Sequence, residues 1–286
     1  MDDARSVLAE RLGVRPLTWS VRGGYTLMER WLVELPHGGR GFAKVDVDEP
    51  TAGFLRDEHR VYSQVEEPFL PRLLAWDDDG KRPLLVIEDL SEAHRPPPWR
   101  PGDVEAVLAA LEQLQATAPP DGLARLTIDE LHTWREVEAD PEPFLSLGLC
   151  SPEWLEGSLP ELLAATDCCD VRGDAFLHLD TRSDNMCVRE GEALLVDWNW
   201  ASIGNPMVDV AFWLPSLFVE GGPAPAEVLP EAGELTAVVS GFFAPVAGLP
   251  PNFGAPTVRA LQLAQLKVAL PWAVEVLGLP PLPPPS

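Results

Sequence analysis

Residues 178–185 read HLDTRSDN, and residues 194–198 read LLVDW. The first stretch holds a carboxylate, Asp180, and an amide, Asn185, at a spacing that lets a short loop turn both side chains to one side. The sequence between the two stretches predicts a β-hairpin. That hairpin would return the chain and deliver Asp197, twelve positions after Asn185, beside the other two. The two stretches therefore predict a loop and a hairpin that gather three polar side chains.

These three side chains suit phosphoryl transfer, in which most of the work is positioning and neutralising phosphate charge. Asp180 is predicted to accept the proton of an attacking hydroxyl, or at least to orient it. Asn185 and Asp197 are predicted to bind magnesium, which prefers oxygen ligands and keeps several waters. The alternatives are an Asx-turn for Asp180, a hairpin turn residue for Asn185 and a helix N-cap for Asp197.

The length and composition describe an ordinary globular chain. Its 286 residues, 46% of them apolar, are enough for one large domain or two lobes. The sequence has no run of about 18 apolar residues, so no membrane-spanning helix is predicted. The acidic start MDDARSV does not resemble a signal peptide. We therefore expect a cytoplasmic protein that does not enter a membrane. The four cysteines lack metal-binding spacing and are expected to be reduced thiols: Cys150, Cys168, Cys169 and Cys187.

The charge balance is strongly acidic. Lysine and arginine together number 21 and aspartate and glutamate 45, for a net charge of −24. This excludes nucleic acid as an expected partner, because nucleic-acid binding requires a basic face. An acidic cleft would instead concentrate a cationic ligand. The other interpretation is that the acidity serves solubility or reflects the source's composition.

Residues 1–90 are expected to form a small antiparallel sheet with one helix inserted after the third strand. Turn residues separate the strand-like stretches from one another. The expected elements are a helix over Asp3–Leu12, two strands within 17–35, a strand over 41–47, a helix over Pro50–Glu67, and strands near Leu70–Ala75 and Leu84–Glu88.

Residues 91–286 are expected to be mainly helical. A polar, proline-rich connector follows Leu90, so we place the lobe boundary there, with a hinge at about 87–91. The proline-rich tail, 279–286, is expected to be extended or disordered. The expected helices are Asp103–Thr117 and segments near 129–138, 151–166, 206–219, 226–245 and 256–278.

Lys44 lies in the middle of a predicted strand, GFAKVDV. A buried lysine is costly unless it is paired, and Glu58 in the next helix is the candidate partner. Such a pair would hold the ammonium against nucleotide phosphates. The alternatives are a solvent-facing Lys44, or a pair with Asp57 or Glu67.

Further residues carry weaker signals. Gly23 and Gly24 could let backbone N–H groups approach phosphate, although such hairpin turns are common without a ligand. Arg182 could reach the transferred phosphate, or form an ion pair with Asp184 or Asp174. Two other residues have expected structural roles: His178 orients the loop by hydrogen bonds, and Asp209 braces the loop or caps a helix. The P-loop and Rossmann glycine motifs are absent.

Taken in order, the motifs RGGYT, FAKV, VIEDL, HLDTRSDN, LLVDWNWASIG and NPMVDVA resemble the aminoglycoside phosphotransferase family. The resemblance implies an α+β, bilobal, protein-kinase-like fold with the nucleotide between the lobes. It also implies that backbone groups of Glu88 and Leu90 bind the adenine. The family usually has glycine after the histidine of the catalytic loop, where this chain has Leu179.

The expected function is an ATP-dependent phosphotransferase, with GTP possible and Mg²⁺ required, that modifies a hydroxyl of a small cationic molecule. Acidic side chains such as Asp140, Glu142, Glu153 and Glu156 are candidates to bind its amine. The expected assembly is a monomer or homodimer. The main alternative is a non-catalytic, nucleotide-binding pseudokinase. A protein kinase is disfavoured because only eleven residues separate Asp197 from Asp209 and no Ala-Pro-Glu segment follows.

Overall fold

The computed structural model describes residues 2–20, 28–46, 48–252 and 255–283. The chain forms two compact units. Unit 1 comprises Met1–Pro96, Arg100–Leu123 and Ser183–Ala201, and unit 2 comprises Pro97–Trp99, Ala124–Arg182 and Ser202–Ser286. The units interleave along the sequence because a helix and a hairpin from later in the chain pack with the N-terminal residues. The expected lobe boundary at residue 90 stays a prediction.

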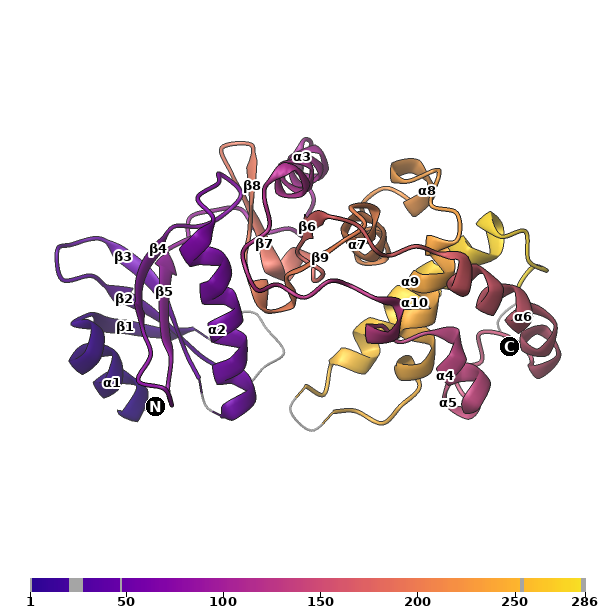
Figure 1. Cartoon of the computed structure of the whole chain (residues 1–286), viewed down its shortest axis with the longest axis horizontal. Helices are drawn as coiled ribbons and strands as arrows, with labels where there is room; N and C mark the ends of the chain where they lie inside the picture. Colours follow the sequence, from indigo (N-terminus) through magenta and orange to yellow (C-terminus); the bar gives the residue numbers. More distant parts are fainter. Residues whose placement is uncertain (1, 21–27, 47, 253–254, 284–286) are drawn as a thin grey trace. The chain divides into compact units, whose positions relative to one another are not determined.

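Unit 1 is built on a five-stranded antiparallel sheet with the order β1-β2-β3-β5-β4. In Figure 1 the helices α1 and α2 lie on either side of these strands. The predicted α+β class is confirmed. The elements of this part are α1 (Asp2–Leu12), β1 (Arg15–Ser20), β2 (Glu29–Glu34), β3 (Arg40–Val45), α2 (Glu49–Gln64), β4 (Leu73–Asp77) and β5 (Leu84–Glu88).

One face of the sheet packs its apolar side chains against α1. Trp31 and Val33 of β2 alternate onto this face and are almost fully buried. They form one core cluster with Ala4 and Leu8 of α1, and with Ala43 of β3. The residues between them, at even positions of β2 and β3, therefore point to the opposite face.

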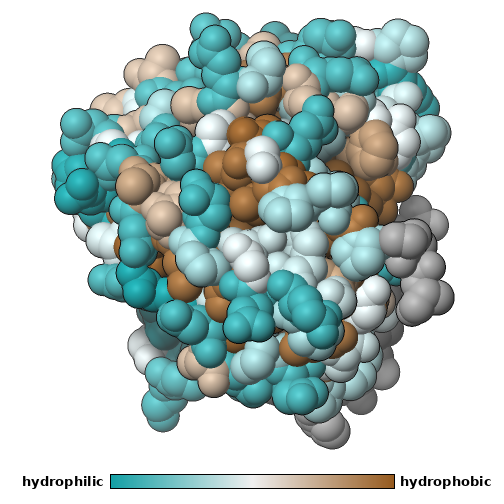
Figure 2. Space-filling model, turned by 90° about the vertical axis from the view of Figure 1, so that its right-hand side faces the viewer, coloured by the Kyte–Doolittle hydropathy of each residue, from teal (hydrophilic) through white to brown (hydrophobic). Residues whose placement is uncertain are grey.

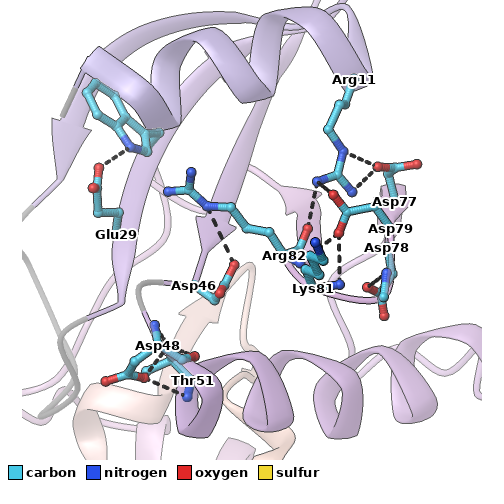
Figure 3. Close-up of polar contacts among 12 residues, drawn as sticks. Arg11, Glu29, Asp46, Asp48, Thr51, Asp77, Asp78, Asp79, Lys81 and Arg82 are labelled. Atoms are coloured by element: carbon cyan, nitrogen blue, oxygen red, sulfur yellow. Dashed lines mark hydrogen bonds and ion pairs between the residues drawn. The ribbon is translucent and has the colours of Figure 1, made fainter.

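Polar contacts tie the end of α1 to the turn between β4 and β5 and cap the start of α2 (Figure 3). Arg11, in the last turn of α1, donates to Asp79 at 3.1 Å and to the Arg82 carbonyl at 2.8 Å, in the turn between β4 and β5. The Asp48 carboxylate caps α2 by accepting the Thr51 N–H at 3.0 Å, and the Thr51 hydroxyl oxygen accepts the Asp48 N–H at 3.1 Å. These contacts fix where α2 begins.

The predicted hairpin belongs to unit 1. It consists of β7 (Met186–Arg189) and β8 (Glu192–Leu195), preceded by the 3-10 helix η2 (Ser183–Asn185) and followed by η3 (Trp198–Trp200). Helix α3 (Asp103–Ala116) packs on β8. Leu90, after β5, packs with Cys187 and Leu194 of the hairpin.

Unit 2 is mainly helical, with one short two-stranded sheet formed by β6 (Ala175–Leu177) and β9 (Ser202–Gly204). The predicted helix over 226–245 is two helices, because Pro230 and Gly233, the latter at φ +51°, interrupt it. The remaining elements are η1 (Ile128–Glu130), α4 (Trp134–Ala139), α5 (Glu142–Leu145), α6 (Pro152–Cys168), α7 (Met207–Val219), α8 (Pro225–Val228), α9 (Leu235–Ala247) and α10 (Val258–Val276).

Where the structure describes the chain, few large apolar side chains are exposed. In unit 2 these are Phe218 and Val219 at the end of α7, and Leu249 after α9. Figure 2 shows one face of the molecule, on which hydrophobic side chains gather within a hydrophilic surround. Among the described residues, none of the helices combines the length and apolar character needed to cross a membrane.

The chain after α10 is not helical through residue 283, as predicted for the proline-rich tail. Part of it is ordered against α6, because the indole N–H of Trp154 donates to the Pro280 carbonyl at 2.8 Å.

Candidate active site

Lys44 is buried on the sheet face opposite the α1 core, with 3% of its side chain exposed. Its Nζ lies 2.8 Å from both carboxylate oxygens of Glu58 in α2, and it also contacts Oδ1 of Asp197. Asp57, the neighbouring candidate, pairs instead with Arg60 at 2.7 Å. The structure therefore brings together three of the residues singled out in the sequence, all within unit 1.

In this cluster one ammonium group, that of Lys44, contacts two carboxyl groups, those of Glu58 and Asp197. Burial raises the pKa of Glu58 to about 7, against the opposing charge of Lys44. Burial acts on Asp197 in the same direction, but the charge and hydrogen bond of Lys44 outweigh it and lower the Asp197 pKa to about 2. For Lys44, burial lowers the pKa, and the two carboxylates more than reverse this. Asp197 is therefore an anion at neutral pH.

Asn185 and Asp197 lie at the same end of the hairpin. Met186 pairs with Leu195, and the Val196 N–H donates to the Asn185 carbonyl at 2.9 Å, so the residues flanking the paired strands are close. Asp197 occupies the N-cap position of η3, at φ +69°, but its side chain makes no capping bond. This geometry disfavours the N-cap alternative.

A magnesium ion fits this donor set. Asp197 offers an ionised carboxylate, and Asn185, 2% exposed, offers an amide oxygen. Over the described ranges, no group of three or more His, Cys, Asp or Glu side chains is arranged to hold a metal. Magnesium shared with nucleotide phosphates needs only one or two protein ligands, so Asn185 and Asp197 would be enough to hold it.

The predicted hinge residues lie at the end of β5 and just after it: Glu88 is its last residue and Leu90 follows it. The Glu88 carboxylate accepts from Arg189 of β7 at 2.7 Å, and Arg72 also approaches it. Burial alone would raise the pKa of Glu88, but these two arginines lower it. Leu90 is buried against the hairpin. The Glu88 side chain is thus engaged in ion pairs and the Leu90 side chain in packing. The predicted adenine contacts would use the backbone of these two residues.

The loop that carries Asp180 starts directly after β6, in unit 2. Asp209, in the first turn of α7, is fully buried and accepts the backbone N–H of His178 at 2.8 Å and of Leu179 at 2.7 Å. The Asp180 N–H donates to Nδ1 of His178 at 3.2 Å. Asp209 therefore braces the loop and His178 orients it by a hydrogen bond, as predicted for both.

Leu179 adopts φ +60°, in the left-handed region that favours glycine. This conformation explains why a glycine at this position suits the loop. The two bonds from consecutive N–H groups to Asp209 hold the strained turn in place. Burial raises the pKa of Asp209 to about 6, against the lowering effect of those two bonds, while the nearby Asp180 adds to the rise.

Asp180 and Arg182 face each other. Arg182 Nε lies 3.0 Å from Oδ1 of Asp180, and Nη2 lies 3.2 Å from Oδ2. Asp174, one of the alternative partners of Arg182, pairs instead with Arg125 at 2.9 Å. The two residues predicted to be catalytic are therefore in contact within unit 2.

Other predicted residues add less. Gly23 and Gly24 lie outside the described residues. The four acidic candidates for binding an amine are all exposed: Asp140, Glu142, Glu153 and Glu156. The sequence did not point to one residue near Lys44. Arg30 of β2 is 7% exposed and lies directly opposite Lys44 of β3 in the strand register. Only the strand register reveals it.

Solved structures with this fold were found by comparison, and they span nearly the whole chain. A choline/ethanolamine kinase family protein from Mesorhizobium loti has 14% identity and a TM-score of 0.62, covering 97% of each chain. Macrolide 2′-phosphotransferase from Brachybacterium faecium has 16% identity and a TM-score of 0.52, covering 97% of this chain and 91% of its own. Choline kinase from Cryptosporidium parvum has 9% identity and a TM-score of 0.54, covering 93% and 91%.

These similarities establish the protein-kinase-like fold. No curated protein matches the sequence. The model of the phosphotransferase enzyme family matches residues 21–242, which is most of the chain and includes Lys44, Asp180 and Asp197. The chain therefore belongs to the phosphotransferase enzyme family, as an ATP-dependent phosphotransferase that acts on small molecules.

Proposed function

We propose that the chain transfers the γ-phosphoryl group of ATP to a hydroxyl of a small, amine-bearing molecule, with Asp180 as the base. The buried contact of Lys44 with Glu58 and Asp197 carries the proposal. A lysine held by two carboxylates is costly to bury. Phosphate binding explains why such a cluster would be kept.

In this proposal Lys44 binds nucleotide phosphates and Glu58 orients it. Asn185 and Asp197 hold magnesium, which when bound neutralises phosphate charge. Backbone groups of Glu88 and Leu90 bind the adenine, and the Gly23–Gly24 segment contacts the phosphates. The same residues would serve GTP if the base pocket admits guanine.

The proposed step is an in-line displacement at the γ-phosphorus. The hydroxyl oxygen of the acceptor forms the new P–O bond, the bond to the β-phosphate oxygen breaks, and ADP leaves. The carboxylate of Asp180 takes the hydroxyl proton, which contributes about 10²–10⁴-fold to the rate. Arg182, paired with Asp180 at 3.0 Å, would neutralise charge on the transferred group.

The acceptor class rests on charge. The net charge of −24 would draw a cationic molecule toward an acidic surface. Two of the similar structures are named for choline or ethanolamine, compounds with both a hydroxyl and a cationic nitrogen.

We place the reaction in the cytoplasm, where four free cysteines would remain reduced.

The test is release of nucleoside diphosphate in a coupled assay with magnesium, ADP from ATP or GDP from GTP, across aminoglycosides, amino sugars, amino alcohols and macrolides. D180N is the blank, and D174N, which changes an exposed aspartate of the same unit, is the matched control. Turnover with an amine-bearing class, lost only in D180N, is the expected result. Turnover with neutral acceptors alone would contradict the proposal that the acceptor bears an amine. Nucleotide binding without any turnover would favour a pseudokinase.

A further inference from the structure

Arg30 and Lys44 form one rung of the sheet. They are direct partners in the antiparallel register of β2 and β3, so both side chains project from the same face. This is the face opposite the core cluster of α1, because the intervening residues Trp31 and Ala43 belong to that cluster. Arg30 therefore shares the surface on which Lys44 meets Glu58 and Asp197.

The register also places this rung relative to the hinge. Glu88 at the end of β5 lies opposite Gly41, three residues before Lys44. At about 3.4 Å per residue, the rung lies about 10 Å from the hinge. Between them Phe42 pairs with Leu32, and both are half-buried. A nucleotide with its adenine at the hinge would pass this apolar rung and present its phosphates to Arg30 and Lys44.

Arg30 is held in place rather than extended into solvent. It is 7% exposed, and its Nη1 donates to the carbonyl of Met28, just before β2, at 3.0 Å. Its charge is close enough to lower the pKa of Asp197 and to oppose protonation of Lys44. A buried arginine beside a lysine is unfavourable unless anions compensate both.

We propose that Arg30 is a second phosphate-binding residue of the nucleotide site, which rests on the function proposed above. Lys44 faces two carboxyl groups, Glu58 and Asp197, so this cluster alone has no excess positive charge to offer a triphosphate. Arg30 supplies the missing positive charge on the same face. Its planar guanidinium can form two parallel hydrogen bonds with phosphate oxygens, which an ammonium cannot.

Calorimetric titration of the full chain with ATP, ADP and adenosine, each with magnesium, tests this role. R30Q should lower the affinity for ATP by about tenfold or more and leave that for adenosine unchanged. R30K should fall between R30Q and the wild type, because it keeps the charge without the fork. R15Q is the matched control: Arg15 is an exposed arginine of the adjacent strand, paired with Glu34, and its loss should change neither affinity.

The outcomes separate this role from the proposed function. Equal ATP affinity in R30Q and the wild type would overturn the role of Arg30 while leaving phosphoryl transfer intact. Equal losses for ATP and adenosine would also overturn it, as a structural effect. A wild-type chain that binds no ATP would overturn the proposed function and this inference together. If R30Q does not fold, R30K serves as the test. A ratio of ATP affinity to adenosine affinity lower than in the wild type would support the role of Arg30, and an unchanged ratio would overturn it.

Discussion

Lys44 Nζ lies 2.8 Å from each carboxylate oxygen of Glu58, although fourteen positions separate the two residues. The lysine is fixed by the ladder of β3 and the glutamate by α2, whose start is set by the Asp48–Thr51 capping box. The position of the ammonium therefore depends on two elements that form by separate local rules. A change in either one should move it.

The first prediction concerns Glu58→Gln. The amide keeps the size of the side chain but cannot hold Lys44 by two charge-assisted bonds, so the ammonium would shift toward Asp197. We expect the KM for ATP to rise about tenfold or more. D57N is the control, since Asp57 is the preceding residue of α2 and pairs only with Arg60 among its described ion pairs. Equal KM values in E58Q and D57N would contradict the role of the pair.

The second prediction concerns Asp197→Asn and magnesium. The low Asp197 pKa, about 2, means that the wild type offers a full negative charge to the metal at neutral pH. The amide offers an oxygen but no charge. Calorimetry with ATP, with and without Mg²⁺, should show that the gain in affinity from the metal falls by about tenfold or more. D78N, which changes a carboxylate paired with Arg56 in the same unit, should keep the full gain.

The sequence could predict the elements that depend on long local patterns. The sheet of unit 1, helices α2 and α3 and the hairpin β7–β8 all have clear periodicity and turn residues, and β5 was placed at its observed bounds. The cost of a buried lysine made Glu58 a candidate partner of Lys44, with Asp57 and Glu67 as alternatives, and the structure shows that the partner is Glu58. The family resemblance is confirmed by the matching family model.

The rest required tertiary structure. Strands β6 and β9 have three residues each, too few for a periodic signal. Arg30 follows the alternation of β2 as an ordinary polar residue, and only the register with β3 places it beside Lys44. The sequence also could not show that Arg182 pairs with Asp180. Several acidic residues lie near Arg182 in the sequence, and each is a possible ion-pair partner.

The third prediction concerns Leu179→Gly. Leu179 is half-buried at φ +60°, a conformation that costs a non-glycine residue about 1–2 kcal/mol. Glycine removes this strain, which offsets its greater freedom in the unfolded chain. We expect L179G to unfold within about 1 kcal/mol of the wild type in urea. L131G, at a half-buried leucine with φ −104°, has no strain to relieve and should lose more. A larger loss in L179G than in L131G would contradict the argument.

The last prediction concerns Asp209 and pH. Its pKa in the folded chain, about 6, lies above the ordinary value of 3.8, so the folded state binds the proton more tightly than the unfolded state. The stability from this group is therefore fully present below about pH 4 and is lost as the pH rises through 6. The rise of the Asp209 pKa from 3.8 to about 6 corresponds to about 3 kcal/mol of unfolding free energy.

Asp209→Asn removes this titration, so the difference in unfolding free energy between wild type and variant isolates it. Urea unfolding of both proteins at intervals from pH 4 to pH 7.5 should show that difference falling as the pH rises, most steeply between about 4 and 6. Other titrating groups contribute equally to both proteins and cancel. A difference that stays constant would mean that the hydrogen bonds from His178 and Leu179 keep Asp209 ionised throughout, and that its bracing of the loop does not depend on pH.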